Sequence, residues 1–183
     1  MNAQIVAESL REVGGILCAN PAIPTLRIVL AGGSAGLLGG LLGPTRTTAD
    51  CDVVWIGDER MWESLAAAAA EAARKLGLPP EWLNRDCAMY AWCLPLAWQD
   101  RCEQVGRFGP LDVMRLSRID LIASKVMSAP RRPQDLEDLR AIRPSHQEIG
   151  FVASHLDRLE AEDLDRRSFG EQRAILGMLG GGS

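Results

Sequence analysis

Two aspartates separated by one residue are the first candidates for chemistry in this sequence. Asp50 and Asp52 flank Cys51 directly before the apolar run 53–56. In a strand, residues i and i+2 point to the same side, with Cα atoms about 6.5–7 Å apart. Two like charges on one face repel, and a divalent cation between them relieves the repulsion. The spacing predicts a pair of metal-binding carboxylates, and exposed acids at a solvated strand end are the alternative.

A glycine-rich turn precedes the two acids. Gly32, Gly33 and Ser34 follow the apolar run 26–31. Backbone amides at the start of a helix point outward, where the helix dipole favours an anion. The turn is therefore a candidate cradle for nucleotide phosphates, although a simple turn from strand to helix has the same sequence. Arg46 is a second candidate, either as a bidentate phosphate clamp or as a surface arginine paired with an acid.

Further charged residues lie later in the chain. Asp112, within the apolar run PLDVM, is a natural place for a third metal-binding carboxylate and equally for a surface acid. Lys125 lies off the buried stripe of its expected helix, free to reach a site or the solvent. Asp135 and Asp138 lie at i and i+3 of the next helix and share a face. A surface charge pair is the usual explanation for such a motif.

The same turn permits a different chemistry. GGSAG satisfies G-x-S-x-G, which makes Ser34 a candidate hydrolase nucleophile with His146 or His155 as its base. This alternative leaves Asp50 and Asp52 unexplained, and the chain has no HGGG-type oxyanion turn. A serine hydrolase is therefore a remote alternative.

Elements of both kinds must position these residues. Hydrophobic spacing and breakers predict helices over 3–18, 34–42 with Ser34 as the cap, 59–76, 117–127, 133–142, from 145 with a Ser145–Glu148 capping box, and 166–179. Strands are expected over 26–31, 52–56, 103–108 and 111–116, and the tryptophan-rich stretch 81–101 as a helical or irregular cover. The order predicts an α+β fold. We expect an α/β core over 1–116, a helical part over 117–179 packed on it, and a flexible tail over 180–183.

Composition limits the class of protein. The chain has 183 residues, of which 47% are hydrophobic and 24% charged, so wholesale disorder is not expected. A formal charge of −4 argues against blanket neutralisation of nucleic-acid phosphates. The five cysteines form no CxxC pair, and the N-terminus carries acids and no long apolar run. A cytoplasmic protein without a membrane anchor is expected.

Taken together, the two clusters resemble a known family. GGS, a spacer and DCDV are similar to the nucleotidyltransferase signature, in which a glycine-serine turn is followed by an Asp-x-Asp strand. KVMSAPRRPQDLEDL resembles the lysine-then-Arg/Asp segment of AbiEii-type and related uncharacterised nucleotidyltransferase-like families, and Trp82-Leu83-Asn84 is similar to another of their segments. The likeness spans about residues 25–142.

The resemblance implies a fold and a site. The fold is a nucleotidyltransferase-like mixed sheet flanked by helices, with a C-terminal helical segment. Gly32, Gly33 and Ser34 would hold the phosphates of an NTP, together with Arg46. Asp50 and Asp52 would bind Mg²⁺ or Mn²⁺. Lys125 would contact a phosphate and Asp135 would complete the acidic site, whereas Asp112 has no family counterpart.

The resemblance also implies a reaction. A nucleoside monophosphate would pass from an NTP to an RNA end, a protein hydroxyl or a small molecule. Some relatives are toxins of toxin–antitoxin systems, so a cognate antitoxin is an expected partner. Six arginines make the later segment locally basic and permit an RNA acceptor: Arg115, Arg118, Arg131, Arg132, Arg140 and Arg143. A catalytically inactive binding or regulatory protein of the same fold is the alternative.

Overall fold

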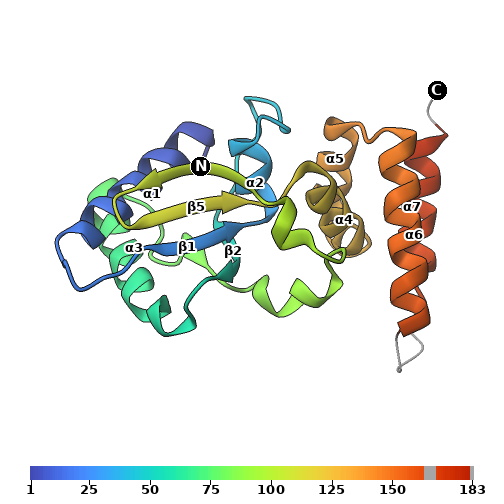
Figure 1. The fold of residues 1–183 in the computed structure, drawn as a ribbon. Helices are drawn as coiled ribbons and strands as arrows, with labels where there is room; N and C mark the ends of the chain where they lie inside the picture. The colour runs from blue at the N-terminus through green and yellow to red at the C-terminus, as the bar shows by residue number, and fades with distance from the viewer. Residues whose placement is uncertain (163–167, 182–183) are drawn as a thin grey trace.

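A mixed five-stranded sheet forms the centre of the molecule (Figure 1). The structure is a computed structural model and describes residues 1–162 and 168–181. The strands are β1 (Leu26–Leu30), β2 (Cys51–Ile56), β3 (Leu83–Asn84), β4 (Glu103–Phe108) and β5 (Leu111–Arg115), in the order β3-β2-β1-β5-β4. β1 is parallel to β5 and antiparallel to β2, while β3 is parallel to β2 and β4 antiparallel to β5.

The register of the central strands decides which residues meet. β1 is a β-branched and leucine-rich run in which only Arg27 is exposed, as expected of a strand covered on both faces. Leu30, its last residue, pairs with Val53 of β2 and with Arg115 of β5. The carboxyl ends of β1 and β5 therefore lie at the same edge of the sheet as the start of β2.

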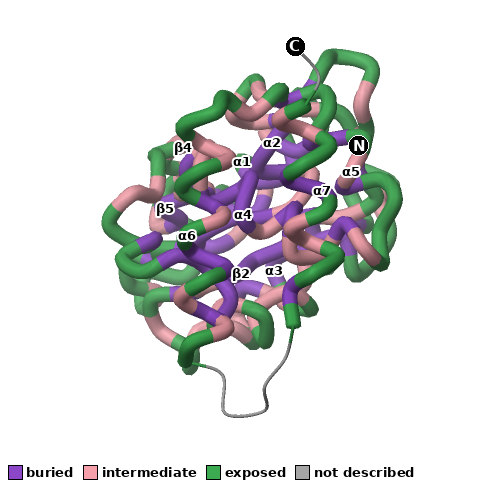
Figure 2. Tube along the Cα trace, turned by 90° about the vertical axis from the view of Figure 1, so that its right-hand side faces the viewer, coloured by how far each residue is buried: buried purple, intermediate pink, exposed green. Residues whose placement is uncertain are grey.

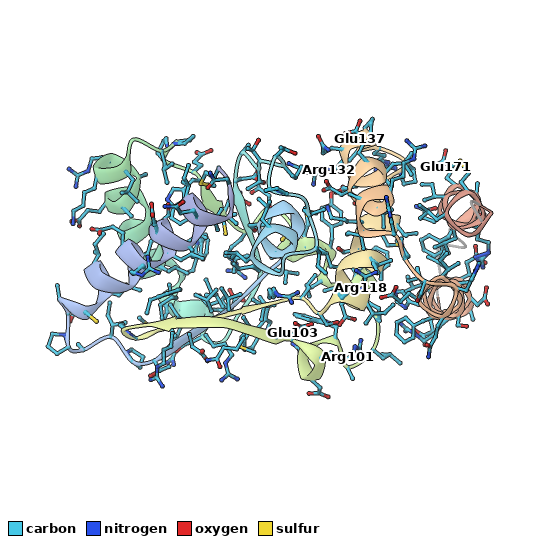
Figure 3. All side chains as sticks on the ribbon, turned by 90° about the horizontal axis from the view of Figure 1, so that it is seen from above. Arg101, Glu103, Arg118, Arg132, Glu137 and Glu171 are labelled. Atoms are coloured by element: carbon cyan, nitrogen blue, oxygen red, sulfur yellow. The ribbon has the colours of Figure 1, made fainter. Side chains whose placement is uncertain are left out.

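Three helices pack together beside the sheet (Figures 1 and 3). They are α1 (Ala3–Cys18), α2 (Gly32–Leu38) and α3 (Trp62–Leu76), the last preceded by the 3₁₀ turn η1 (Glu59–Met61). α1 buries Val6, Leu10 and Val13, at the spacing of one helix face. α3 buries Ala68, Ala69, Ala72 and Ala73, and these small side chains let α1 and α3 approach closely. Gly77, in the left-handed conformation at φ 69°, ends α3.

A segment of short turns connects β3 to β4. It contains two 3₁₀ helices, η2 (Ala88–Cys93) and η3 (Trp98–Arg101). Trp82, before β3, is fully buried and donates from its indole N–H to the Ala69 carbonyl at 3.0 Å. The tryptophan-rich stretch is thus an irregular cover, as the sequence predicts.

Four further helices follow the sheet, and Figure 1 shows them beyond the ends of β1 and β5. They are α4 (Arg118–Ser128), α5 (Pro133–Ile142), α6 (His146–Glu162) and α7 (Gly170–Gly180). α4 is the most central, because it contacts α2 on one side and α5, α6 and α7 on the other. Figure 2 shows buried residues, in purple, at α4. The C-terminal helices are therefore joined to the sheet through α4.

The structure confirms the predicted α+β class and most elements. The helix over 133–142 agrees at both ends, and the Ser145–Glu148 capping box forms, with N–H···O distances of 2.7 and 3.2 Å. The helix expected over 34–42 is wrong in its bounds. It begins at Gly32, with Ala31 as the N-cap, and ends at Leu38, before Gly39 and the left-handed Gly40 at φ 64°. Residues 166–167 of the last expected helix and 182–183 of the expected tail lie outside the described residues, and Gly180 belongs to α7.

Two general features accompany the fold. No helix within the described residues is both long and apolar enough to cross a membrane. All five cysteines are free thiols. Cys51, between the two acids in the sequence, is fully buried and belongs to the core.

Candidate functional site

Asp52 lies against the first glycine of α2. Its carbonyl accepts the Ala31 N–H at 2.9 Å, which fixes the start of β2 beside the start of α2. Gly32 has φ 62°, a conformation that L side chains rarely adopt. A Cβ at Gly32 would lie 2.5 Å from the Asp52 carboxylate oxygen Oδ2. Glycine is therefore required twice over here, for the backbone turn and for the space the carboxylate occupies.

The Asp52 carboxylate is buried without a neutralising contact. Asp52 is 9% exposed, and among residues 1–162 and 168–181 its carboxylate has neither a hydrogen bond nor an ion pair. Burial, and then the negative charge of Asp50, raises the pKa of Asp52 to about 6. Such a group is costly to keep ionised in a folded chain unless a cation joins it.

Asp50 precedes β2 and is held by the loop before it. The Thr48 hydroxyl donates to the Asp50 carbonyl at 3.0 Å and lies 3.4 Å from its carboxylate. A Cβ at Gly33 would lie 2.9 Å from the same hydroxyl oxygen. The glycine pair thus lets the 46–50 loop close onto α2, which brings Asp50 and Asp52 to one end of the sheet.

Ser34 lies inside α2 and is completely buried. Its hydroxyl donates to the Ala31 carbonyl at 3.1 Å, so it does not cap the helix as the sequence predicted. The first backbone hydrogen bond of the helix runs from the Ala35 N–H to the Ala31 carbonyl at 3.2 Å. The N–H groups of Gly32, Gly33 and Ser34 precede this hydrogen bond. Like the first N–H groups of every helix, they have no carbonyl partner within the helix.

Four charged side chains form a connected network between this loop and the C-terminal helices. Arg46 donates to both carboxylate oxygens of Asp138, at 2.8 and 3.2 Å. The Lys125 ammonium donates to Asp138 at 2.6 Å and to Asp135 at 2.7 Å. Arg46 and Lys125 together outweigh the effect of burial and lower the pKa of Asp138. We call Arg46, Lys125, Asp135 and Asp138 the ionic network.

The ionic network occupies three of the predicted site residues, Lys125, Asp135 and Arg46. Lys125 is 2% exposed and already holds two carboxylates, so its ammonium does not face the solvent. Asp135 also accepts the Ser128 hydroxyl at 2.7 Å, and its charge contributes to raising the pKa of Asp52. Arg46 takes the second of its two predicted roles, pairing with an acid.

Asp112 lies at the other end of the sheet. It pairs with Arg27 in the register of β1 and β5, three positions before Arg115, which is level with Leu30. Its carboxylate accepts the Arg27 guanidinium at 2.8 Å and the Gln104 amide at 3.3 Å. The structure therefore does not bring Asp112 to Asp50 and Asp52. The described residues contain no group of three or more His, Cys, Asp or Glu side chains arranged to hold a metal ion.

Two polar residues beside Asp52 were not among the predicted site residues. Asn84 of β3 is the direct partner of Asp52 in the sheet, and its side-chain oxygen accepts the Asp86 N–H at 2.9 Å. The negative charge of Asp86 contributes to raising the pKa of Asp52. The only sequence signal was the Trp82-Leu83-Asn84 likeness, since a two-residue strand leaves no periodicity.

The hydrolase arrangement is not formed. Ser34 donates to a backbone carbonyl, whereas His155 donates from Nε2 to the Cys93 carbonyl at 2.8 Å and contacts Arg158 through Nδ1 at 3.1 Å. Burial lowers the pKa of His155. His146 is exposed at the start of α6. None of these contacts couples a histidine to Ser34.

The surroundings of the acid pair are unevenly charged. Among the arginines of the later segment, Arg115 pairs with Glu103 and Arg118 with Glu148. Arg131, Arg132, Arg140 and Arg143 are exposed. Arg132, labelled in Figure 3, precedes α5, and its charge acts to lower the pKa of Asp52.

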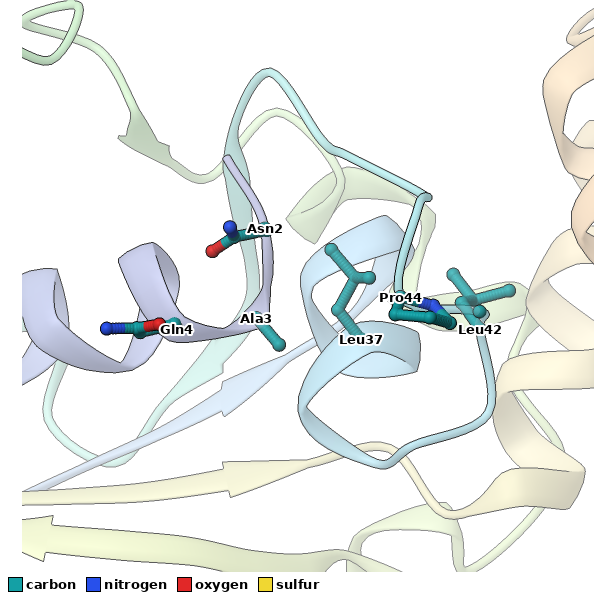
Figure 4. A pocket seen from close by; sticks show the side chains of 7 residues that line it. Asn2, Ala3, Gln4, Leu37, Leu42 and Pro44 are labelled. Carbon is teal, nitrogen blue, oxygen red and sulfur yellow. The ribbon is translucent and has the colours of Figure 1, made fainter.

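A separate hollow lies between the start of α1 and the end of α2, lined by Asn2, Leu37 and Pro44 among others (Figure 4). It carries no acid.

A mixed sheet with a glycine turn leading from β1 to a helix, and an acid pair at the start of the neighbouring antiparallel strand, defines a nucleotidyltransferase-type fold. The profile of a family described as nucleotidyltransferase of unknown function (DUF6036) matches residues 16–147. The match covers more than half of the chain, which therefore belongs to this family of nucleotidyltransferases. No curated protein and no solved structure matches the chain.

Proposed function

We propose that the chain transfers a nucleoside monophosphate from an NTP to a hydroxyl acceptor, with release of pyrophosphate, in a metal-dependent reaction at Asp50 and Asp52. The observation that carries this proposal is the Asp52 carboxylate, which is buried beside Asp50 with no hydrogen bond or ion pair among the described residues. Carboxylate oxygens are the ligands that Mg²⁺ and Mn²⁺ prefer. The donor set therefore fits the metal that the family implies.

The residues of the site would have different roles in this reaction. Asp50 and Asp52 would hold the metal, which when bound polarises phosphoryl oxygens and neutralises developing charge. The backbone N–H groups of Gly32 and Gly33, at the start of α2, would donate to phosphates beside the carboxylates. The ionic network keeps the 46–50 loop against α2 and so sets the position of Asp50. In this proposal Lys125 and Asp135 support the site through that loop.

The proposal is tested by calorimetric titration of the protein with each NTP, with and without Mg²⁺. We expect Mg²⁺-dependent binding that Asp52→Asn abolishes. Asp112→Asn is the matched control, because it removes a similarly buried acid at the other end of the sheet and should leave binding intact. Binding that is indifferent to both Mg²⁺ and Asp52 would overturn the metal site.

A second candidate is a nucleotide-binding regulatory protein without turnover. The two-acid site favours it, because no third carboxylate joins Asp50 and Asp52 in the described residues. Incubation with α-labelled NTPs and total RNA, or with cellular protein, separates the two candidates. Label transferred to an acceptor in a manner dependent on Asp50 and Asp52 supports the transferase. Metal-dependent binding with no transfer supports the regulatory protein.

A toxin role belongs to the same proposal and rests on the likeness to toxin families alone. Growth arrest on expression, relieved by Asp50→Ala and by a co-expressed neighbouring gene product, would support it. Unchanged growth would remove it and leave the transferase proposal in place.

A further inference from the structure

The turn segment after β3 displays four large apolar side chains. Met89, Tyr90, Trp92 and Leu96 are between 51% and 71% exposed. They lie within eight residues, on η2 and the turn that follows it. Large apolar side chains exposed this densely within one segment commonly mark a binding site. We call these four residues the apolar platform.

Buried residues within the same segment hold the apolar platform in place. Cys93 and Leu94 are almost completely buried, and His155 of α6 donates to the Cys93 carbonyl at 2.8 Å. Within η2 the Tyr90 N–H donates to the Cys87 carbonyl at 3.0 Å. The segment therefore has buried side chains of its own, and the exposed ones belong to a fixed backbone.

The apolar platform adjoins the acid pair. Asn84, six residues before Tyr90, pairs directly with Asp52, and six residues span at most about 20 Å of chain. η2 packs on β2. Cys87, which precedes η2, has its pKa raised to about 12 by burial and then by the negative charge of Asp52. In Figure 1 the green to yellow-green chain that follows β3 lies below the sheet.

We propose that the apolar platform stacks on the base of the NTP whose phosphates bind at Asp50 and Asp52; this rests on the proposed function above. A nucleobase has a flat face that aromatic side chains bind regardless of its identity. A protein partner would need about 20–30 residues on this side, many more than the platform provides. A nucleic-acid strand would bring a phosphate for every nucleotide past Asp50 and Asp86, whereas the phosphates of a single NTP are those that a metal at Asp50 and Asp52 would neutralise.

The experiment compares wild-type protein with Tyr90→Ala/Trp92→Ala, titrated with NTP and with inorganic triphosphate, both with Mg²⁺. We expect the double variant to weaken NTP binding about 5- to 150-fold, which corresponds to about 1–3 kcal/mol for stacking. Triphosphate binding should not change, because it has no base. Tyr90→Phe/Trp92→Phe should restore NTP binding. Met178→Ala, an equally exposed apolar residue on α7, is the control and should behave as wild type.

Each remaining outcome has a defined meaning. NTP binding unchanged in the double variant overturns the proposal, and so does an equal loss for triphosphate. A loss confined to a short single-stranded RNA, with NTP binding intact, also overturns it and assigns the platform to the acceptor. If triphosphate does not bind even the wild type, the proposed function fails; nucleosides then test the platform alone, and it stands only if the double variant weakens their binding.

Discussion

At the scale of single residues, Asp52 is the most informative position. Its carboxylate is packed against a glycine that no other residue replaces without a clash, and neither a hydrogen bond nor an ion pair to it is found in the described chain. Asp112 has similar exposure, yet Arg27 pairs with it. The two acids therefore differ in their effect on stability as well as in their chemistry. Of the two, only Asp52 lowers the free energy of unfolding when it is ionised.

That cost predicts a pH dependence. The pKa of Asp52 is raised from 3.8 to about 6 in the folded chain. Between these values the folded state keeps a proton that the unfolded state has released, so stability falls as the pH rises through this window. Above pH 6 the ionised group costs about 2–3 kcal/mol of unfolding free energy. We expect Asp52→Asn to exceed the wild type by about 1–3 kcal/mol at pH 7.5 and to match it near pH 4.

Denaturant unfolding with a metal chelator at both pH values checks this prediction. The chelator is needed because a bound cation would stabilise the wild type and hide the difference. Asp112→Asn should instead lose stability at pH 7.5, since it breaks the contact with Arg27. A gain for Asp52→Asn that is the same at both pH values would show that charge is not the cause.

At the scale of elements, the ionic network joins parts of the chain that are distant in sequence. Lys125 belongs to α4, Asp135 and Asp138 to α5, and Arg46 to the loop before β2. Arg46 and Thr48 both approach the Cβ position of Gly33. The network therefore positions the loop that carries Asp50, and its members need not touch a nucleotide to affect the site.

We expect Lys125 and Arg46 to contribute unequally to the free energy of unfolding. Lys125→Met leaves two buried carboxylates facing each other, and we expect it to cost about 3–5 kcal/mol of unfolding free energy. Arg46→Met should cost less, because its side chain is partly exposed and Asp138 keeps Lys125. Guanidinium unfolding of both variants measures the difference. A loss below about 1 kcal/mol for Lys125→Met, the value of a surface pair, would contradict the network's buried role.

At the scale of the whole molecule, α4 connects the sheet layer to the C-terminal helices. Its buried residues contact α2 on one side and α6 and α7 on the other. The family match ends at residue 147, within the first turn of α6, so most of α6 and all of α7 lie beyond it. The predicted division at 116/117 places α4 with the later helices, although α4 packs on both sides.

This arrangement predicts one cooperative unfolding transition. Scanning calorimetry should show a single peak, with an enthalpy of roughly 130 kcal/mol near 60 °C and a van't Hoff enthalpy equal to it. Hydrogen exchange should give α4 protection equal to that of β1. A separate, earlier transition of α6 and α7 would show that they form a unit of their own.

The sequence by itself determined the elements and the family. Regular periodicity, capping residues and glycine breakers are local signals, and they placed α1, α5 and the capping box of α6 closely. The glycine turn and Asp50-x-Asp52 identified the nucleotidyltransferase fold, because a motif of this kind depends on neighbours in the chain. Short elements such as β3 could not be predicted, since two residues carry no periodicity.

The tertiary structure decided what each charged side chain faces. Whether Asp112 joins the acid pair depends on the register of β5 against β1, and that register is set by packing far from Asp50. Whether Lys125 meets a phosphate or two carboxylates depends on the docking of α5 onto α4. Asn84 reaches Asp52 only because β3 pairs with β2. These are contacts between residues distant in sequence, and the free energy of the whole fold selects them.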